Sequence, residues 1–294
     1  MTFRIGIDIG GTFTDFALID DARGAISIHK QLTTPQDPSQ AVLDGIDAIL
    51  GQRGIGISDV TSIIHGSTLV TNSLIERRGA PVGMLVTRGF RDVIDIALET
   101  RYDLYDLRIQ LPAPLVPRNM RIEIDERVRA DGSIETALDS AQVDAAVDRL
   151  VADGAASIAV CFLHTFTNDA HEQAAVARIR ERHPDIYVSA SADIFPFMRE
   201  YERWTTTTMN AFTQPVVDRY LSLIEDGLRE RGFGGLLHIM TSSGGTVTAE
   251  IARRYPVRML ESGPAAGVLM SSFHGRALGL NRLLSFDMGG TTAK

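Results

Sequence analysis

One short pattern, Asp-x-Gly-Gly-Thr, occurs near both ends of this chain, each time directly after an apolar run. The first copy begins at Asp8 and the second at Asp287. Apolar runs bounded by Gly-rich turns are typical of strands, and a strand–turn unit that occurs twice indicates two related lobes. The pair therefore predicts an α/β protein in which two Gly-rich turns face one cleft.

The first copy has the residue types that an anion-binding turn needs. Gly10 and Gly11 allow backbone angles that a side chain would forbid, and they let the main chain come close to a ligand. N–H groups around such a turn can hold a phosphate, and Thr12 and Thr14 add hydroxyl donors. Asp8 would repel a phosphate but can hold a hydrated Mg²⁺. The alternative is an ordinary Gly-Gly hairpin that is duplicated by chance.

Length, charge and cysteine content narrow the classes of protein. The 294 residues carry a net charge of −8, so the basic surface that binds nucleic acid or anionic membranes is missing. Cys161 is the only cysteine, which rules out an intramolecular disulfide and fits a cytoplasmic protein. No apolar stretch is long enough to cross a bilayer, and the first residues do not form a signal peptide.

The order of apolar periods predicts the architecture. Up to residue 87 the order is β-β-β-α-β-α-β, with the last strand at 81–87, and this order suits a ribonuclease-H-like lobe. Residues 100–135 are less regular, but from Ser140 to about residue 190 helices and strands alternate, which predicts a parallel α/β sheet. A long helix follows from about residue 197 to 231, and Pro215 is expected to kink or divide it.

Two further stretches carry polar or Gly-rich signals where strands and helices meet. His65, Ser67, Thr68 and Asn72 lie where a strand at 61–66 gives way to a helix, and ligands bind beyond such strand ends in open α/β sheets. The alternative for these residues is capping and turn chemistry. The Gly-rich stretch 261–268 precedes a helix whose N-terminus can bind an anion, or whose small residues serve only close packing.

Several stretches together resemble the hydantoinase A and 5-oxoprolinase family. They include IGIDIGGTFTDFALID, HGSTLVTNSLIERRGAPVGMLVTRGFRDVIDI, REYERWTTTTMNAF, ESGPAAGV and FDMGGTT. This family is part of the acetate and sugar kinase, Hsp70 and actin superfamily. The resemblance implies a ribonuclease-H-like, actin-like ATPase lobe with an additional α/β segment and a second lobe that is only begun. It implies an N-terminal α/β domain at 1–195, the start of a hydantoinase A domain at 196–294, and a longer parent protein.

The resemblance also implies a function and a set of site residues. The family uses ATP to open a cyclic amide or imide, such as a hydantoin, a lactam or 5-oxoproline, by phosphorylating the amide oxygen. Asp8 and Asp287 would orient Mg²⁺, and His65, Ser67, Thr68 and Asn72 would contact the substrate. The residues expected to hold the ATP phosphates are Gly10, Gly11, Thr12, Thr14, Gly289, Gly290, Thr291 and Thr292.

Three functional hypotheses stay open from the sequence. The first is the A-type subunit of an ATP-dependent cyclic amidohydrolase, which would work with a B-type hydantoinase subunit. The second is a subunit of an ATP-dependent ketone carboxylase, which bicarbonate-dependent ketone consumption would reveal. The third is a truncated, non-catalytic fragment that binds a partner, because a half-built lobe would leave apolar surface uncovered.

Overall fold

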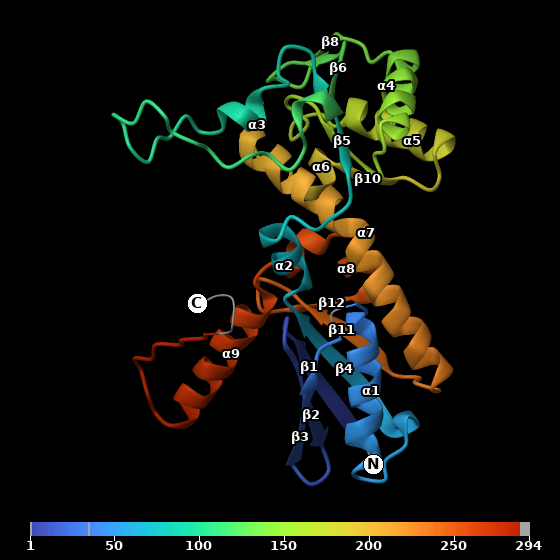
Figure 1. Cartoon of the computed structure of the whole chain (residues 1–294), viewed down its shortest axis with the longest axis vertical. Helices are drawn as coiled ribbons and strands as arrows, with labels where there is room; N and C mark the ends of the chain where they lie inside the picture. The colour runs from blue at the N-terminus through green and yellow to red at the C-terminus, as the bar shows by residue number, and fades with distance from the viewer. Residues whose placement is uncertain (1, 35, 289–294) are drawn as a thin grey trace. The chain divides into compact units, whose positions relative to one another are not determined.

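The computed structural model describes all residues except 1, 35 and 289–294 (Figure 1). The chain divides into two compact units. The first unit joins Met1–Arg78 to Val216–Lys294, and the second unit is Gly79–Pro215. The domain boundary predicted between residues 195 and 196 lies inside the second unit, and the predicted domains stay a prediction.

The first unit contains a six-stranded mixed sheet. Its strand order is β12-β11-β4-β1-β2-β3. β1 runs parallel to β4 and antiparallel to β2, while β11 continues the sheet parallel to β4. The strands are β1 (Phe3–Ile9), β2 (Phe13–Asp20), β3 (Ala25–Leu32), β4 (Val60–Ser67), β11 (Leu236–Met240) and β12 (Thr246–Thr248).

One face of this sheet carries the apolar core of the unit, which helices cover. In β1 the side chains of Phe3, Ile5 and Ile7 are buried and alternate with exposed or half-buried residues, as the period of two in a strand requires. Apolar residues of α1 (Pro38–Gly51) and of the second half of α7 (Glu200–Glu230) complete this core. The opposite face carries polar groups and exposed apolar side chains. The remaining helices of the unit are α2 (Leu69–Ile75), α8 (Ala249–Arg254) and α9 (Ser262–Ala277).

The predicted element order is confirmed, but one strand belongs to another sheet. The sequence at 81–87 forms β5 (Val82–Thr87), which pairs with β6 and β9 in the second unit. In the first unit, β11 takes the place next to β4. Every residue of β5 is buried, which is typical of a central parallel strand. Periodicity reports that a strand exists but not which strand it pairs with, so the order alone misplaced it.

The second unit is built on a four-stranded parallel sheet of order β10-β9-β5-β6, so the predicted parallel sheet is confirmed. The helix α7 continues through Pro215 rather than being divided by it. Among the described residues, no helix is both long and apolar enough to cross a membrane. The other elements of this unit are β6 (Arg121–Ile124), β7 (Arg127–Val128), β8 (Ile134–Thr136), β9 (Ser157–Cys161), β10 (Tyr187–Ala190), α3 (Val93–Ile96), α4 (Ser140–Ala152), α5 (Ala170–Arg182) and α6 (Ser191–Ile194).

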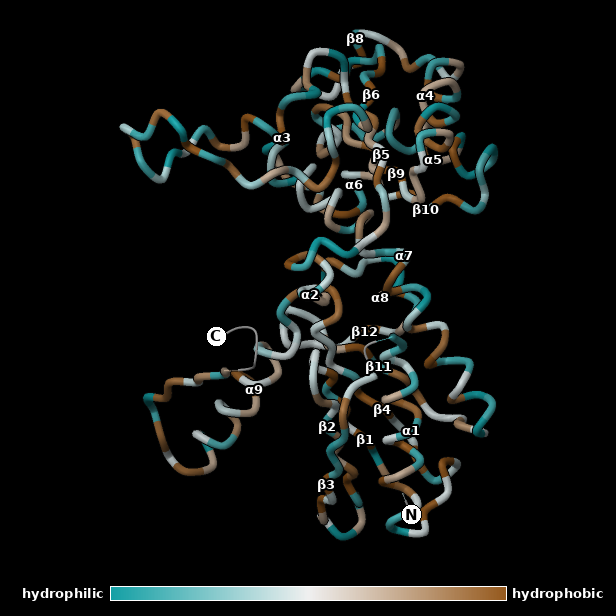
Figure 2. Tube along the Cα trace, in the orientation of Figure 1, coloured by the Kyte–Doolittle hydropathy of each residue, from teal (hydrophilic) through white to brown (hydrophobic). Residues whose placement is uncertain are grey.

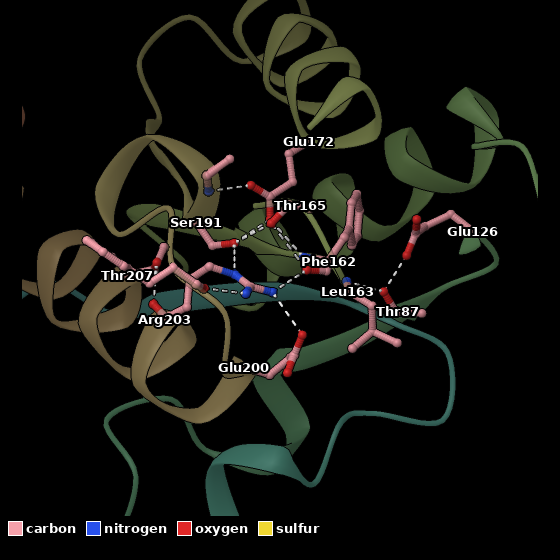
Figure 3. A network of polar contacts seen from close by, with 12 residues as sticks. Thr87, Glu126, Phe162, Leu163, Thr165, Glu172, Ser191, Glu200, Arg203 and Thr207 are labelled. Atoms are coloured by element: carbon pink, nitrogen blue, oxygen red, sulfur yellow. Dashed lines mark hydrogen bonds and ion pairs between the residues drawn. The ribbon is translucent and has the colours of Figure 1, made fainter. Parts of the chain in front are cut away.

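A buried polar network lies against the carboxyl ends of β9 and β10 (Figure 3). The fully buried guanidinium of Arg203 donates to the Phe162 carbonyl oxygen and to the Ser191 hydroxyl, each at 3.0 Å. The Glu172 carboxylate accepts from the Phe162 and Ala192 N–H groups at 2.8 Å and from the Ser191 hydroxyl at 2.7 Å. A buried carboxylate is tolerated when donors surround it in this way, so the network links α5, α6 and α7 to the sheet.

Candidate functional site

The first Gly-rich turn follows Asp8, which alternates with the buried core residues of β1 and is exposed. Asp8 lies one residue before the end of β1, opposite Asp15 of β2 and opposite Gly66 of β4. A Cβ atom on Gly66 would lie 3.3 Å from Asp8 Oδ1. This separation is tight for a carbon next to a carboxylate oxygen, so a glycine at 66 leaves room for the Asp8 side chain.

Negative charge gathers around Asp8. The surrounding atoms take away part of the water around its carboxyl group, and this raises the pKa of Asp8; Asp15 and Asp287 raise it further, while Lys30 lowers it. Lys30 Nζ lies 2.8 Å from both carboxylate oxygens of Asp15. Like charges close together favour a proton or a metal cation between them. The arrangement therefore suits a cation at Asp8.

The carboxylates of the described residues do not make a complete metal site by themselves. No group of three or more His, Cys, Asp or Glu side chains in the described chain is placed to hold a metal ion. Asp287 is exposed, yet it is close enough to affect the Asp8 pKa. A Mg²⁺ ion at this site would take its other oxygen ligands from water and phosphate, as this ion usually does.

The turn after β1 is shaped by close contacts rather than by unusual backbone angles. The Gly10 N–H donates to the Phe13 carbonyl oxygen at 2.9 Å. Neither Gly10 nor Gly11 has a φ angle in the left-handed region, so the prediction of glycine-specific angles is wrong. A Cβ on Gly10 would lie 3.3 Å from Phe13 O, and one on Gly11 would lie 3.7 Å from Asn72 Nδ2. The space that Gly10 keeps free is the reason for a glycine there.

The two threonines of this turn differ in their surroundings. Thr12 is exposed, so its hydroxyl is accessible to a ligand. Thr14 is fully buried, and its hydroxyl oxygen lies 2.9 Å from the hydroxyl oxygen of Thr33. The alternation along β2 turns Thr14 toward the covered face. Its position favours a structural role rather than the predicted phosphate contact. The other predicted phosphate residues, Gly289, Gly290, Thr291 and Thr292, lie outside the described residues.

The junction between β4 and α2 is brought to the same place. The main-chain N–H and the hydroxyl of Thr68 each donate to the Ile9 carbonyl oxygen at 3.2 Å. The Asn72 side-chain amide donates to Thr68 Oγ1 at 3.2 Å and lies beside Gly11. Ser67 is buried, and its hydroxyl accepts from the Leu69 N–H. The structure thus places Thr68 and Asn72 against the first turn.

His65 does not share the face on which Asp8 lies. It pairs with Ile7, not with Asp8, so its side chain points to the covered face of the sheet. The ring is buried, and Nε2 lies 2.8 Å from the Tyr220 hydroxyl of α7. Burial lowers the pKa of His65 to about 4, against a raising contribution from the Ile7 backbone. The structure does not support the predicted substrate contact, because a shift of one residue along a strand reverses the face.

The N-terminus of α9 completes the site. Ser262 Oγ donates to the Ser67 carbonyl oxygen at 3.1 Å, and the Glu261 N–H donates to Thr71 Oγ1 at 3.3 Å. A Cβ on Gly263 would lie 3.9 Å from Asp8 Oδ1. Glu261 has a φ of 59°, a left-handed conformation that is uncommon for a non-glycine residue. The first turn of α9 therefore lies beside Asp8 and β4.

Two residues of the site were missed by sequence reasoning. Gly66 lies within β4 with no neighbouring glycine to mark a turn, and only its pairing with Asp8 reveals its role. Lys30 pairs with Asp15 across β2 and β3 and is the cation that lowers the Asp8 pKa. Exposed and half-buried residues alternate along β3, and Lys30 is at an exposed position. This alternation was the sequence signal that could have identified Lys30.

Two family models match this chain. The model of the hydantoinase/oxoprolinase N-terminal region matches residues 4–183, and the hydantoinase/oxoprolinase model matches residues 203–294.

Curated relatives match almost the whole chain. The alpha subunit of caprolactamase from Pseudomonas jessenii is 35% identical over 99% of this chain and 42% of its own length. The beta subunit of acetone carboxylase from Xanthobacter autotrophicus is 28% identical over 98% of the chain and 42% of its own. 5-Oxoprolinase from Saccharomyces cerevisiae is 30% identical over 98% of the chain and 25% of its own. The chain therefore spans less than half the length of each relative.

Solved structures agree with this relationship. The ATP-dependent caprolactamase from Pseudomonas jessenii superposes with a TM-score of 0.88, at 34% identity over 99% of this chain and 43% of its own. The nucleotide-free acetone carboxylase superposes with a TM-score of 0.86, at 27% identity over 99% of this chain and 43% of its own. Both likenesses extend over nearly every residue of the chain, so they apply to both compact units.

Proposed function

The chain belongs to the hydantoinase/oxoprolinase family, and we propose that it is the ATP-binding component of an enzyme that hydrolyses a cyclic amide or imide. The observation that carries this proposal is the convergence of Asp8, the turn at Gly10 and Gly11, the junction at Thr68 and the first turn of α9. The names of relatives support ATP use and ring-amide substrates: an ATP-dependent caprolactamase and a 5-oxoprolinase.

Each group at this site has a proposed task. Asp8 and Asp287 would hold Mg²⁺ through water, since their mutual repulsion is relieved by a cation. The main-chain N–H groups of the first turn, with the Thr12 hydroxyl, would bind phosphate oxygens. The N-terminal turn of α9 adds a favourable dipole for an anion. We assign Gly289, Gly290, Thr291 and Thr292 to the same phosphate-binding task on the basis of their repeated pattern.

The chemistry of ring opening explains why phosphates are needed. An amide is a poor electrophile, and bound Mg²⁺-ATP would supply a phosphoryl group that activates the amide oxygen for attack by water. The task of this chain's own residues is then to position phosphates and neutralise charge, because those two effects dominate catalysis of phosphoryl transfer. Thr68 and Asn72 would orient the group next to the first turn, and Ser67 would shape the junction through its backbone.

A second candidate is a subunit of an ATP-dependent ketone carboxylase. The acetone carboxylase structure favours it, because its likeness extends over 99% of this chain. Both candidates require the same nucleotide site, so Asp8 does not distinguish them. In either case we propose a cytoplasmic protein that works with a second subunit, a B-type hydantoinase subunit under the first candidate. The third possibility is a non-catalytic fragment that binds a partner.

One experiment separates these candidates. The whole protein, as its gene encodes it and with the subunits that co-purify, is assayed for ADP release with caprolactam, 5-oxoproline, hydantoin, or acetone plus bicarbonate. We expect ADP release that depends on a ring amide. Release that requires both acetone and bicarbonate would establish the carboxylase instead. If no ADP is released with any of these substrates and the protein does not bind Mg²⁺-ATP, both enzymatic proposals are contradicted.

A further inference from the structure

A loop of the second unit presents large apolar side chains to solvent. Residues 96–111, called the 96–111 loop here, begin at the last residue of α3 and extend away from the sheet of their unit (Figure 1). Tyr105 is 91% exposed and Leu107 is 93% exposed. Figure 2 shows apolar positions interspersed with polar ones along this loop. The other exposed large apolar residues of the loop are Ile96, Leu98, Tyr102, Leu104 and Leu111.

The segments on either side of the loop are held by one buried arginine. The Arg121 side chain is 1% exposed. Its Nε donates to the Val116 carbonyl oxygen at 3.0 Å, beyond the loop, and its Nη1 donates to the Arg91 carbonyl oxygen at 3.1 Å, before the loop. The same guanidinium binds both carboxylate oxygens of Asp95. The base of the 96–111 loop is therefore fixed to the strand β6.

Some polar groups of the loop form hydrogen bonds within the loop. The Tyr105 N–H donates to Asp103 Oδ1 at 2.9 Å, and the Arg108 N–H donates to Asp106 Oδ1 at 2.8 Å. Arg101 Nη2 donates to the Asp106 carbonyl oxygen at 2.7 Å. These bonds fold the carboxylates toward the backbone while the tyrosine and leucine side chains stay exposed.

We propose that the 96–111 loop inserts into an apolar groove on a second, non-identical subunit. Tyrosine side chains, here the exposed Tyr102 and Tyr105, are enriched at interface centres, and a fixed base reduces the entropy lost on binding. The relatives that match this chain over 98–99% of its residues are named as lettered subunits, alpha of caprolactamase and beta of acetone carboxylase. Such names indicate chains that work beside non-identical chains.

Other binding partners suit the loop less well. Between residues 96 and 111 the carboxylates of Glu99, Asp103 and Asp106 outnumber the guanidinium groups of Arg101 and Arg108, which disfavours an anionic membrane surface. A second copy of this chain and another part of the same protein are tested as alternatives below. The inference rests on the proposed assembly with a second subunit, but it does not depend on which ring substrate the enzyme uses.

The first test is a photo-cross-link from the tip of the loop. p-Benzoylphenylalanine is placed at position 105 of the whole protein, which is produced in its native host together with its co-purifying subunits. We expect irradiation to join it to a co-purifying polypeptide of different sequence. The matched control has the same probe at position 134, where Ile134 of β8 is 51% exposed in the same unit, and we expect it to give no such product. A cross-link to a second copy, within the chain, or to nothing would overturn the proposal.

The second test measures affinity for that co-purified subunit. Because Tyr105 and Leu107 are exposed, the double variant Tyr105→Ser with Leu107→Ser should melt at the wild-type temperature. We expect its dissociation constant to rise at least about tenfold, while Ile134→Ser stays close to wild type. Unchanged affinity of the double variant would overturn the role of the loop. If the wild-type protein proves to be homomeric, both this inference and the proposed second subunit fail. The proposed nucleotide site is tested separately by ADP release with a ring amide.

Discussion

Asp8 in the first unit and Glu172 in the second unit both lie near the carboxyl ends of parallel strands, but their neighbours are opposite in kind. Asp8 is exposed and faces the carboxylates Asp15 and Asp287. Glu172 is buried and accepts hydrogen bonds from Phe162, Ser191 and Ala192. Asp8 therefore lies among negative charges with few hydrogen-bond donors, whereas both carboxylate oxygens of Glu172 accept hydrogen bonds.

The difference teaches which acidic group is available to a ligand. Burial raises the pKa of Glu172 to about 7, against lowering contributions from Ser191, the two N–H donors and Arg203. The Glu172 site is closed and satisfied, so adding a ligand would break bonds that already exist. At Asp8 a cation would relieve repulsion and complete an unfinished set of contacts. We therefore place function at Asp8 and stability at Glu172.

The largest effect should follow from breaking the closed network. Arg203→Ala removes the cation beside Glu172 and leaves buried acceptors without a donor, so we expect the free energy of unfolding to fall by about 3–5 kcal/mol. Urea denaturation measures this change. The control Arg180→Ala removes an exposed arginine from α5 and should stay within about 0.5 kcal/mol of wild type. A loss for Arg203→Ala as small as that of the control would show that the network is not structural.

A smaller effect should appear as a dependence of stability on pH. The pKa of Glu172 is raised in the folded state to about 7, so its protonated form favours folding, and that stability is present at low pH and lost as pH rises through 7. Relative to Glu172→Gln, which cannot titrate, the free energy of unfolding of wild type should fall by roughly 2–3 kcal/mol between pH 5 and pH 8. Parallel pH curves for the two proteins would contradict the raised pKa.

The smallest expected effect is on Mg²⁺-ATP binding at Asp8. Gly66→Ala would bring a methyl group within 3.3 Å of Asp8 Oδ1, whereas Gly6→Ala on β1 would meet its nearest atom, Ala17 O, at 4.0 Å. We expect Gly66→Ala to weaken Mg²⁺-ATP binding about tenfold by displacing the carboxylate, and Gly6→Ala to leave it unchanged. Equal affinities in titration calorimetry would mean that the space beside Asp8 is not needed.

The site at Asp8 was easier to predict from the sequence than the buried network at Glu172, for a physical reason. Asp8 and its glycines are adjacent in sequence, so their pattern can be read locally. Glu172 and Arg203 lie on different helices, α5 and α7, and a charged residue in a helical pattern is ordinarily solvent-facing. Only the fold brings the two together.

Strand periodicity also left pairing and register undetermined. The strand at 82–87 was correctly predicted but assigned to the wrong sheet, because pairing depends on contacts between distant segments. His65 was placed on the functional face, although its register with Ile7 turns it toward Tyr220. In both cases the kind of element was predictable and its partner was not.

The central claim is that Asp8 holds the cation of a nucleotide-binding site. Calorimetric titration of the whole protein with Mg²⁺-ATP tests this claim most directly. Asp8→Asn keeps the size of the side chain and removes a charge from a repulsive cluster, so the variant should fold at least as well as wild type. Asp44→Asn on the exposed side of α1 is the control. We expect binding by wild type and Asp44→Asn and a loss of at least about tenfold in Asp8→Asn. Equal binding by all three proteins would contradict the claim.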